Sequence, residues 1–226
     1  MRLTIWRYEL GRIGWPALLA APLALAAVGL LALLAQQFGN PHQVNSILSE
    51  WLDVLPVGAG IGAAGAVRPD SAFELQLSLP TSFRSTALRR LALTSGWTAL
   101  LSLLIGWFLA FSGRLIWPVS PAADQLIWLA PLLALSAAGA AATLGLRAFA
   151  VGSGIVAVLF VFERLFSDLF LANPGLQTFW LFLRYAEVTP QQWYVNRALL
   201  LLGAVALFAL TFWLLGRTER LLGGEA

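Results

Sequence analysis

Side chains able to carry out acid–base, nucleophilic or metal chemistry are few and widely spaced in this chain. It has one histidine, His42, and no cysteine, and all 14 basic residues are arginine. Proteolysis by serine and histidine within a membrane needs a histidine at membrane depth, whereas His42 follows Pro41 in a polar stretch. A histidine-based metal site is excluded by count, and the carboxylates are not spaced as ligands. We therefore expect that this chain is not an enzyme by itself and binds no cofactor.

Five ionisable residues next to apolar stretches are the remaining candidates: Glu50, Asp53, Glu163, Arg164 and Asp168. Ionisable groups at membrane depth are costly and usually functional. Glu50 and Asp53, one helical turn apart, are candidates for a polar outer pathway, and Glu163 is a third. A simple interfacial location explains Glu50 and Asp53 equally well, and an ion pair of Arg164 with Glu163 or Asp168 explains the others without a ligand. None forms the central pair of facing carboxylates that aspartyl chemistry requires.

The surrounding sequence is compatible with lipid. Hydrophobic residues make up 59% of the 226 and charged residues only 11%, against about 25% charged in soluble domains. About 20 apolar residues in a helix cross a bilayer core. We predict one all-α transmembrane domain, 1–226, with six spans: 15–36, 47–67, 91–112, 126–146, 149–166 and 198–215. The second span begins at residue 47 or nearer 54, and residues 1–14 form an interfacial helix or a positively charged flank.

The distribution of arginine predicts the orientation. Short loops rich in arginine stay in the cytoplasm. With the N-terminus inside, the inner segments hold ten arginines and the outer segments hold four. We therefore expect a multi-pass protein of the cell membrane with both termini cytoplasmic, and a cytoplasmic polar segment at 68–90.

This polar segment, RPDSAFELQLSLPTSFRSTALRR, has signals for a helix, a break and a second helix. Ser71 and Glu74 form a capping-box pattern, and Pro80 ends that helix near Ser78. Thr81 or Ser82 then caps a helix that continues into the third span. The segment is either a contact surface for a second protein or a solvated loop whose arginines only set the topology.

Small residues recur in two spans: Gly58, Gly62 and Gly65 in the second, and Gly152 and Gly154 in the fifth. Gly58 and Gly62 form a GxxxG pair, which permits close approach of two helices. Such residues serve either packing within one bundle or a dimer seam.

The outer stretch from Ser167 to Arg197 contains a strong turn signal, Asn173-Pro174-Gly175, between apolar pieces at 165–172 and 179–183. We predict an outer helical hairpin that enters the outer leaflet without crossing. The alternative is a surface helix over 179–183 with aromatic residues at the interface.

The run from Leu55 to Leu93, LPVGAGIGAAGAVRPDSAFELQLSLPTSFRSTALRRLAL, resembles the second span, coupling helix and third-span entrance of ABC type-2 permeases, the type V exporter fold. The resemblance implies that the permease dimerises with a second copy or a homologous permease, and that two ABC ATPase subunits dock on the coupling helices. It implies an outer gate in the hairpin, and it places the second and fifth spans beside the pathway. On that resemblance the residues in or beside the ATPase groove are Phe73, Glu74, Leu75, Leu77, Arg84, Arg89 and Arg90.

The absence of lysine agrees with ATP being bound by a separate ATPase subunit. The phosphate-binding GxxxxGK[ST] loop needs a lysine, so ATP and Mg²⁺ would bind to the partner ATPase. The expected partners are the ATPase subunits, a second permease and membrane lipid, and we expect no nucleic acid. The small, apolar candidate pathway residues favour a lipid-like, peptide or drug-like amphipathic cargo. The alternative function is a structural or assembly subunit of a membrane complex that transports nothing.

Overall fold

The computed structural model describes residues 15–37, 47, 51–68, 83–112, 120 and 123–217. The regular structure within these residues is helical throughout. The predicted interfacial helix at 1–14 and the predicted short helix after Ser71 lie outside the described residues. The fold class is therefore all-α, as the sequence predicts.

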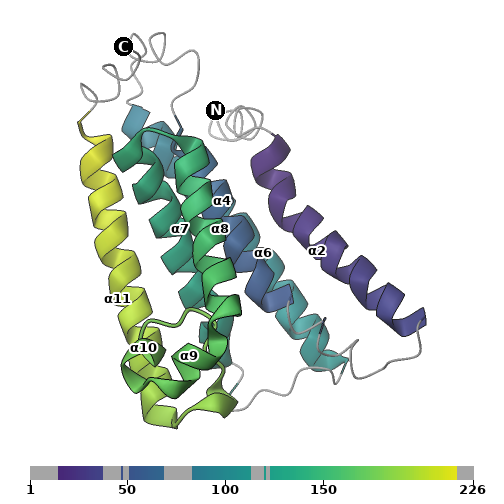
Figure 1. Cartoon of the computed structure of the whole chain (residues 1–226). Coiled ribbons are helices and arrows are strands. Elements are labelled where there is room, and N and C mark those ends of the chain that lie inside the picture. Colours follow the sequence, from purple (N-terminus) through teal and green to yellow (C-terminus); the bar gives the residue numbers. More distant parts are fainter. Residues whose placement is uncertain are drawn as a thin grey trace.

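Long helices run beside one another along most of the described chain (Figure 1). Their bounds are α2 Trp15–Gln37, α4 Trp51–Ala66, α6 Phe83–Phe111, α7 Leu126–Leu146, α8 Phe149–Leu165 and α11 Pro190–Leu215. Four short elements complete the described regular structure: η1 Ala123–Gln125, α9 Ser167–Ala172, α10 Pro174–Gln177 and η2 Tyr185–Glu187. The start of α6 and the end of α11 lie at one end of the bundle, here called the inner end, and α9 and α10 lie at the opposite, outer end (Figure 1).

Three of these helices are long and apolar enough to cross a membrane: Phe83–Phe111, Ala123–Leu146 and Pro190–Leu215. Large apolar side chains such as Leu104, Phe108 and Leu202 are exposed along them, as expected of surfaces that face lipid. The chain therefore has the character of a membrane protein. A helix occupies each of the six predicted ranges, but α4, with 16 residues, rises only about 24 Å, so the count of six spans remains a prediction.

Helix α6 runs from Phe83 to Phe111 without interruption, while the predicted caps Thr81 and Ser82 lie outside the described residues. Helix α7 ends where Arg147 adopts the left-handed conformation, with φ of 57°. This conformation reverses the chain, so α8 begins two residues later at Phe149.

Arginines of the described residues separate between the two ends. Six belong to the inner end and three to the outer end: Arg68, Arg84, Arg89, Arg90, Arg147 and Arg217, against Arg164, Arg184 and Arg197. Successive long helices thus run in opposite directions between the two ends, as the arginine count assumes. Which end faces the cytoplasm remains a prediction.

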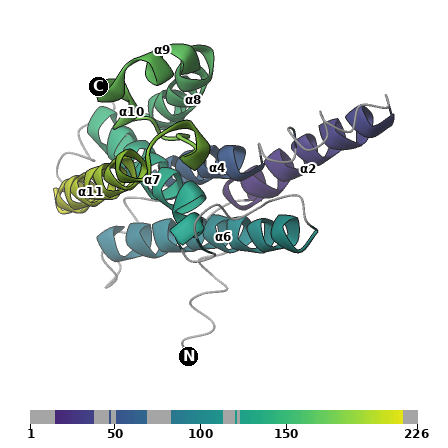
Figure 2. The same ribbon diagram turned by 90° about the horizontal axis from the view of Figure 1, so that it is seen from below.

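Helix α4 is the shared neighbour in the bundle, packed against α2, α6, α7 and α8 (Figures 1 and 2). Small side chains make this possible. A Cβ atom on Gly139 of α7 would collide with the carbonyl oxygen of Gly60 on α4, and one on Gly60 would meet the Val156 side chain of α8 at 2.8 Å. A Cβ on Gly152 would collide with Thr143. Hence α4, α7 and α8 approach to backbone contact, and we call this the glycine seam.

Replacing Gly139 with alanine should destabilise the bundle, because the new methyl group meets backbone rather than a flexible side chain. Overpacking of this kind costs about 1–3 kcal/mol. Gly96 of α6 is the matched control, since a Cβ there meets nothing within 4 Å, and alanine at that helical site should leave stability unchanged or raise it by about 0.5–1 kcal/mol. Thermal unfolding in detergent, followed by tryptophan fluorescence, measures both. Equal stability of the two variants would contradict the seam.

Candidate functional site

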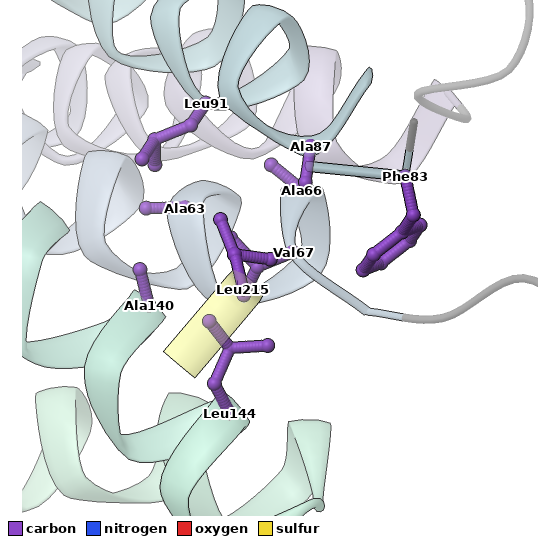
Figure 3. Close-up of a cluster of buried hydrophobic side chains, with 9 residues drawn as sticks. All are labelled: Ala63, Ala66, Val67, Phe83, Ala87, Leu91, Ala140, Leu144 and Leu215. Atoms are coloured by element: carbon purple, nitrogen blue, oxygen red, sulfur yellow. The ribbon is translucent and has the colours of Figure 1, made fainter. Parts of the chain in front are cut away.

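The inner end holds an apolar cluster that contains Val67, just before the predicted polar segment at 68–90, and Phe83 within it. Val67, which closes α4, is 0% exposed and Phe83, which opens α6, is 3% exposed. Both belong to one cluster with Leu215 at the end of α11. Figure 3 shows the cluster, here called the inner clamp: Ala63, Ala66, Val67, Phe83, Ala87, Leu91, Ala140, Leu144 and Leu215. Val67 and Phe83, which lie on either side of the segment at 68–82, therefore pack together with α7 and α11.

Arginines at the start of α6 occupy three different environments. The guanidinium of Arg84 lies 3.3 Å from the centre of the Phe212 ring on α11, a cation–π contact that ties α6 to α11. Arg89 is half-buried and Arg90 is only 2% exposed. Of the predicted coupling residues, Phe73, Glu74, Leu75 and Leu77 lie outside the described residues. Contact of the three arginines with an ATPase stays a prediction, and Arg90 is buried within its own chain.

The outer end holds a polar cluster that the sequence revealed only in part. We call it the outer polar cluster: Asp53 of α4, Glu163 and Arg164 of α8, Arg184, and Asn196 and Arg197 of α11. Glu163, Asn196 and Arg197 bind the backbone of the outer connection, defined here as residues 166–189 between α8 and α11. Arg184 is itself part of this connection. Glu163, Asn196 and Arg197 are 4%, 0% and 1% exposed.

Three of these side chains hydrogen-bond to the backbone of the outer connection. The Glu163 carboxylate accepts the amide of Leu181, at 3.0 Å to one oxygen and 3.2 Å to the other. The guanidinium of Arg197 donates to the carbonyl oxygens of Leu181, at 2.8 Å, and of Leu183. The Asn196 amide donates to the carbonyls of Gln177 and Trp180, at 2.8 and 2.9 Å. The connection is thus held from α8 on one side and from α11 on the other.

These bonds explain why the second arm of the predicted hairpin is not helical. Residues 179–183 adopt turn and irregular conformations, and the α-helical parts of the connection are α9 and the four-residue α10. The Asn-Pro-Gly signal marks the start of α10: the Asn173 side chain accepts the Gly175 amide at 3.0 Å, and Pro174 is the first helical residue. Buried non-helical backbone needs other partners for its polar groups, and the outer polar cluster supplies them.

Asp53 joins α4 to this assembly through two arginines. Its Oδ2 lies 2.6 Å from Nη2 of Arg164 and 3.4 Å from Nη2 of Arg184. The Arg164 guanidinium also lies 5.7 Å from the centre of the Phe182 ring. Arg164 therefore reaches across to α4, a partner 111 residues away that the local alternatives, Glu163 and Asp168, did not suggest.

The predicted pathway residues are placed as follows. Asp53 and Glu163 are both nearly buried, at 6% and 4% exposed, while Glu50 lies outside the described residues. In the conformation described, these two carboxylates bind protein groups. Their contact with a cargo stays a prediction.

The glycines predicted to form a dimer seam or pathway lie mostly inside the bundle. A Cβ on Gly58 would meet the backbone of Ala21 on α2 at 3.4 Å, one on Gly65 would meet the Phe149 ring, and Gly152 belongs to the glycine seam. Gly62 is buried, whereas Gly154 has open space beside it. Packing within one chain accounts for the first four, and Gly154 is a position where another helix can approach.

Sequence reasoning undervalued two polar residues of the cluster, Asn196 and Arg197. Arg197 counted only as one of the four outer arginines, and Asn196 was not singled out. The signal in the sequence was a polar pair directly before the apolar run that begins at Ala198. Polar groups in such a position are costly unless they have buried partners.

The described part of the chain has no group of three or more potential metal ligands. Comparison of the chain with family models, with curated proteins and with solved structures gave no match.

Replacing Arg197 with lysine should loosen the outer connection, because an ammonium cannot reproduce the forked donation to Leu181 and Leu183. Loss of one hydrogen bond to a charged group costs about 1.5–3 kcal/mol. We expect faster amide hydrogen exchange in residues 177–183 and unchanged exchange in the glycine seam. Arg147→Lys, at an exposed arginine of the inner end, is the control. Protection of 177–183 as strong in the variant as in the parent would rule out this role.

Proposed function

We propose that this chain is the transmembrane subunit of an ATP-binding-cassette exporter, which dimerises and is driven by separate ATPase subunits. The observation that carries the proposal is the inner clamp. The segment with the ELQLSLP pattern joins α4 to α6, and the described residues that flank it, Val67 and Phe83, are buried in one cluster with α7 and α11. A loop that only set the topology would need no such anchoring.

The clamp provides a route for mechanical force. A push on residues 69–82 acts on Val67 and Phe83 together, so α4 and α6 move as a pair. The cation–π contact between Arg84 and Phe212 makes α11 move together with α4 and α6. Because α4 also packs against α7 and α8 through the glycine seam, a displacement at the inner end is passed along α4 to Asp53 at the outer end. Close-packed interiors transmit such displacements because they compress little.

The outer connection is the proposed outer gate. It consists of short helices and irregular backbone packed over the outer ends of α8 and α11, with Phe170 stacked on Trp180 at 5.7 Å and Leu183 and Trp193 beside them. In the proposed exporter such a cover would close the outer end. The proposed cargo is amphipathic, of lipid-like, peptide or drug-like character, because the pathway candidates in the sequence are small and apolar.

A non-transporting structural subunit is the alternative, and the two differ in their dependence on an ATPase. We expect the tagged chain to recover an ABC ATPase from its native membranes. The Phe73→Ala/Leu77→Ala double variant should insert and unfold like the parent, yet uncouple ATP hydrolysis from transport. The control is Leu104→Ala/Phe111→Ala, which removes exposed apolar side chains of α6. Recovery of no ATPase, together with normal transport in the first double variant, would sink the exporter proposal.

A further inference from the structure

Contacts at the outer end fall into two kinds. Glu163, Asn196 and Arg197 bind the backbone of the outer connection and are all nine-tenths or more buried. They bind the connection to α8 and α11 as one unit. Helix α4 belongs to this unit by a different kind of contact, since Asp53 reaches it through the side chains of Arg164 and Arg184.

The two kinds of contact differ in their access to water. The side chain of Asp53 is 8% exposed, but those of Arg164 and Arg184 are 33% and 46% exposed. The two guanidinium groups already touch water, so only the Asp53 carboxylate has to be newly hydrated when this contact separates. Loss of the partners of Glu163, Asn196 or Arg197 would leave polar groups on both sides of the contact to be hydrated, at a larger cost. The contact at Asp53 is therefore the easier one to separate.

Apolar packing lies inward of this ion pair. Val57, one turn further along α4, packs against the cluster that contains Leu181 and Phe182 of the outer connection. Apolar contacts of this kind are non-directional and permit sliding. Among the described residues, Asp53 thus gives the outer end of α4 a directional contact with the outer connection.

We propose that Asp53, Arg164 and Arg184 form a releasable latch, in which one carboxylate holds two guanidinium groups and so closes the outer connection onto α4. Opening separates the carboxylate from both arginines and exposes the face of Val57 to water. The hydrogen bonds from Glu163, Asn196 and Arg197 stay in place during this motion. The inference rests on the proposed exporter function, because it names the contact that would keep the outer gate shut.

A cysteine-free chain makes the latch directly testable. Val57→Cys is introduced into the full chain in its membrane, and its reaction with a membrane-impermeant maleimide is timed. Asp53→Asn in this background should raise the labelling rate at least several-fold, because a neutral amide no longer holds the two guanidinium groups. Asp168→Asn is the matched control, since it removes a carboxylate of the same outer connection that lies outside the latch. It should leave the rate unchanged, and Asp53→Glu should keep it close to that of the parent.

The arginine side of the latch gives a second variant in case Asp53→Asn does not fold. Arg164→Gln/Arg184→Gln leaves the carboxylate in place and should also raise labelling of the cysteine introduced at position 57. If a folded Asp53→Asn, or the folded arginine double variant, labels at the rate of the Asp168→Asn control, the latch is refuted.

Labelling of the chain alone needs neither ATPase nor cargo, so this result is independent of the proposed function. Adding the ATPase with ATP to the Val57→Cys chain tests that function separately, with faster labelling of the introduced cysteine as the expected result. Fast labelling in Asp53→Asn without any response to ATP would retain the latch and overturn the exporter assignment. Slow labelling in Asp53→Asn with a response to ATP would do the reverse.

Discussion

Backbone amide and carbonyl groups that leave a helix near a bilayer must find partners within the protein, because lipid offers none. The outer connection breaks its helical structure between α10 and η2, and this constraint determines what surrounds it. Glu163 must be buried beside Leu181, and Asn196 and Arg197 must interrupt the apolar sequence of α11. These three polar side chains would lack buried partners if the connection were helical, and their burial would then be unfavourable.

The constraint at the outer end and the clamp at the inner end meet in α4. This helix has small side chains along much of its length, including Gly58, Gly60 and three alanines with no exposed surface. Helices α7 and α8 can therefore approach its backbone. At its inner end Val67 is fixed in the clamp, and at its outer end Asp53 contacts both arginines. A helix that is tightly packed in the middle and attached by charge at one end is suited to carry a displacement between two surfaces, as the exporter proposal requires.

Local signals in the sequence predicted local structure well. The turn at Arg147 falls between the two apolar runs at 126–146 and 149–166, because it depends on a few neighbouring residues. The irregular backbone at 179–183 and the contact between Asp53 and Arg164 were not predicted, since each depends on residues more than a dozen positions away. The glycines were recognised as close-approach positions, yet only the packing partners, such as Gly139 opposite Gly60, show that the approach occurs within one chain.

In the proposed exporter, binding of ATP by the partner ATPase at the inner end moves the helices at the outer end. Spin labels on cysteines introduced at Gln37, the outer end of α2, and at Ala186 in η2 would both occupy exposed positions, and their separation can be measured by pulsed electron paramagnetic resonance. We expect the distance distribution to shift when the partner ATPase and ATP are both present, and not with either alone. An unchanged distribution with the ATPase bound and ATP supplied would rule out this coupling.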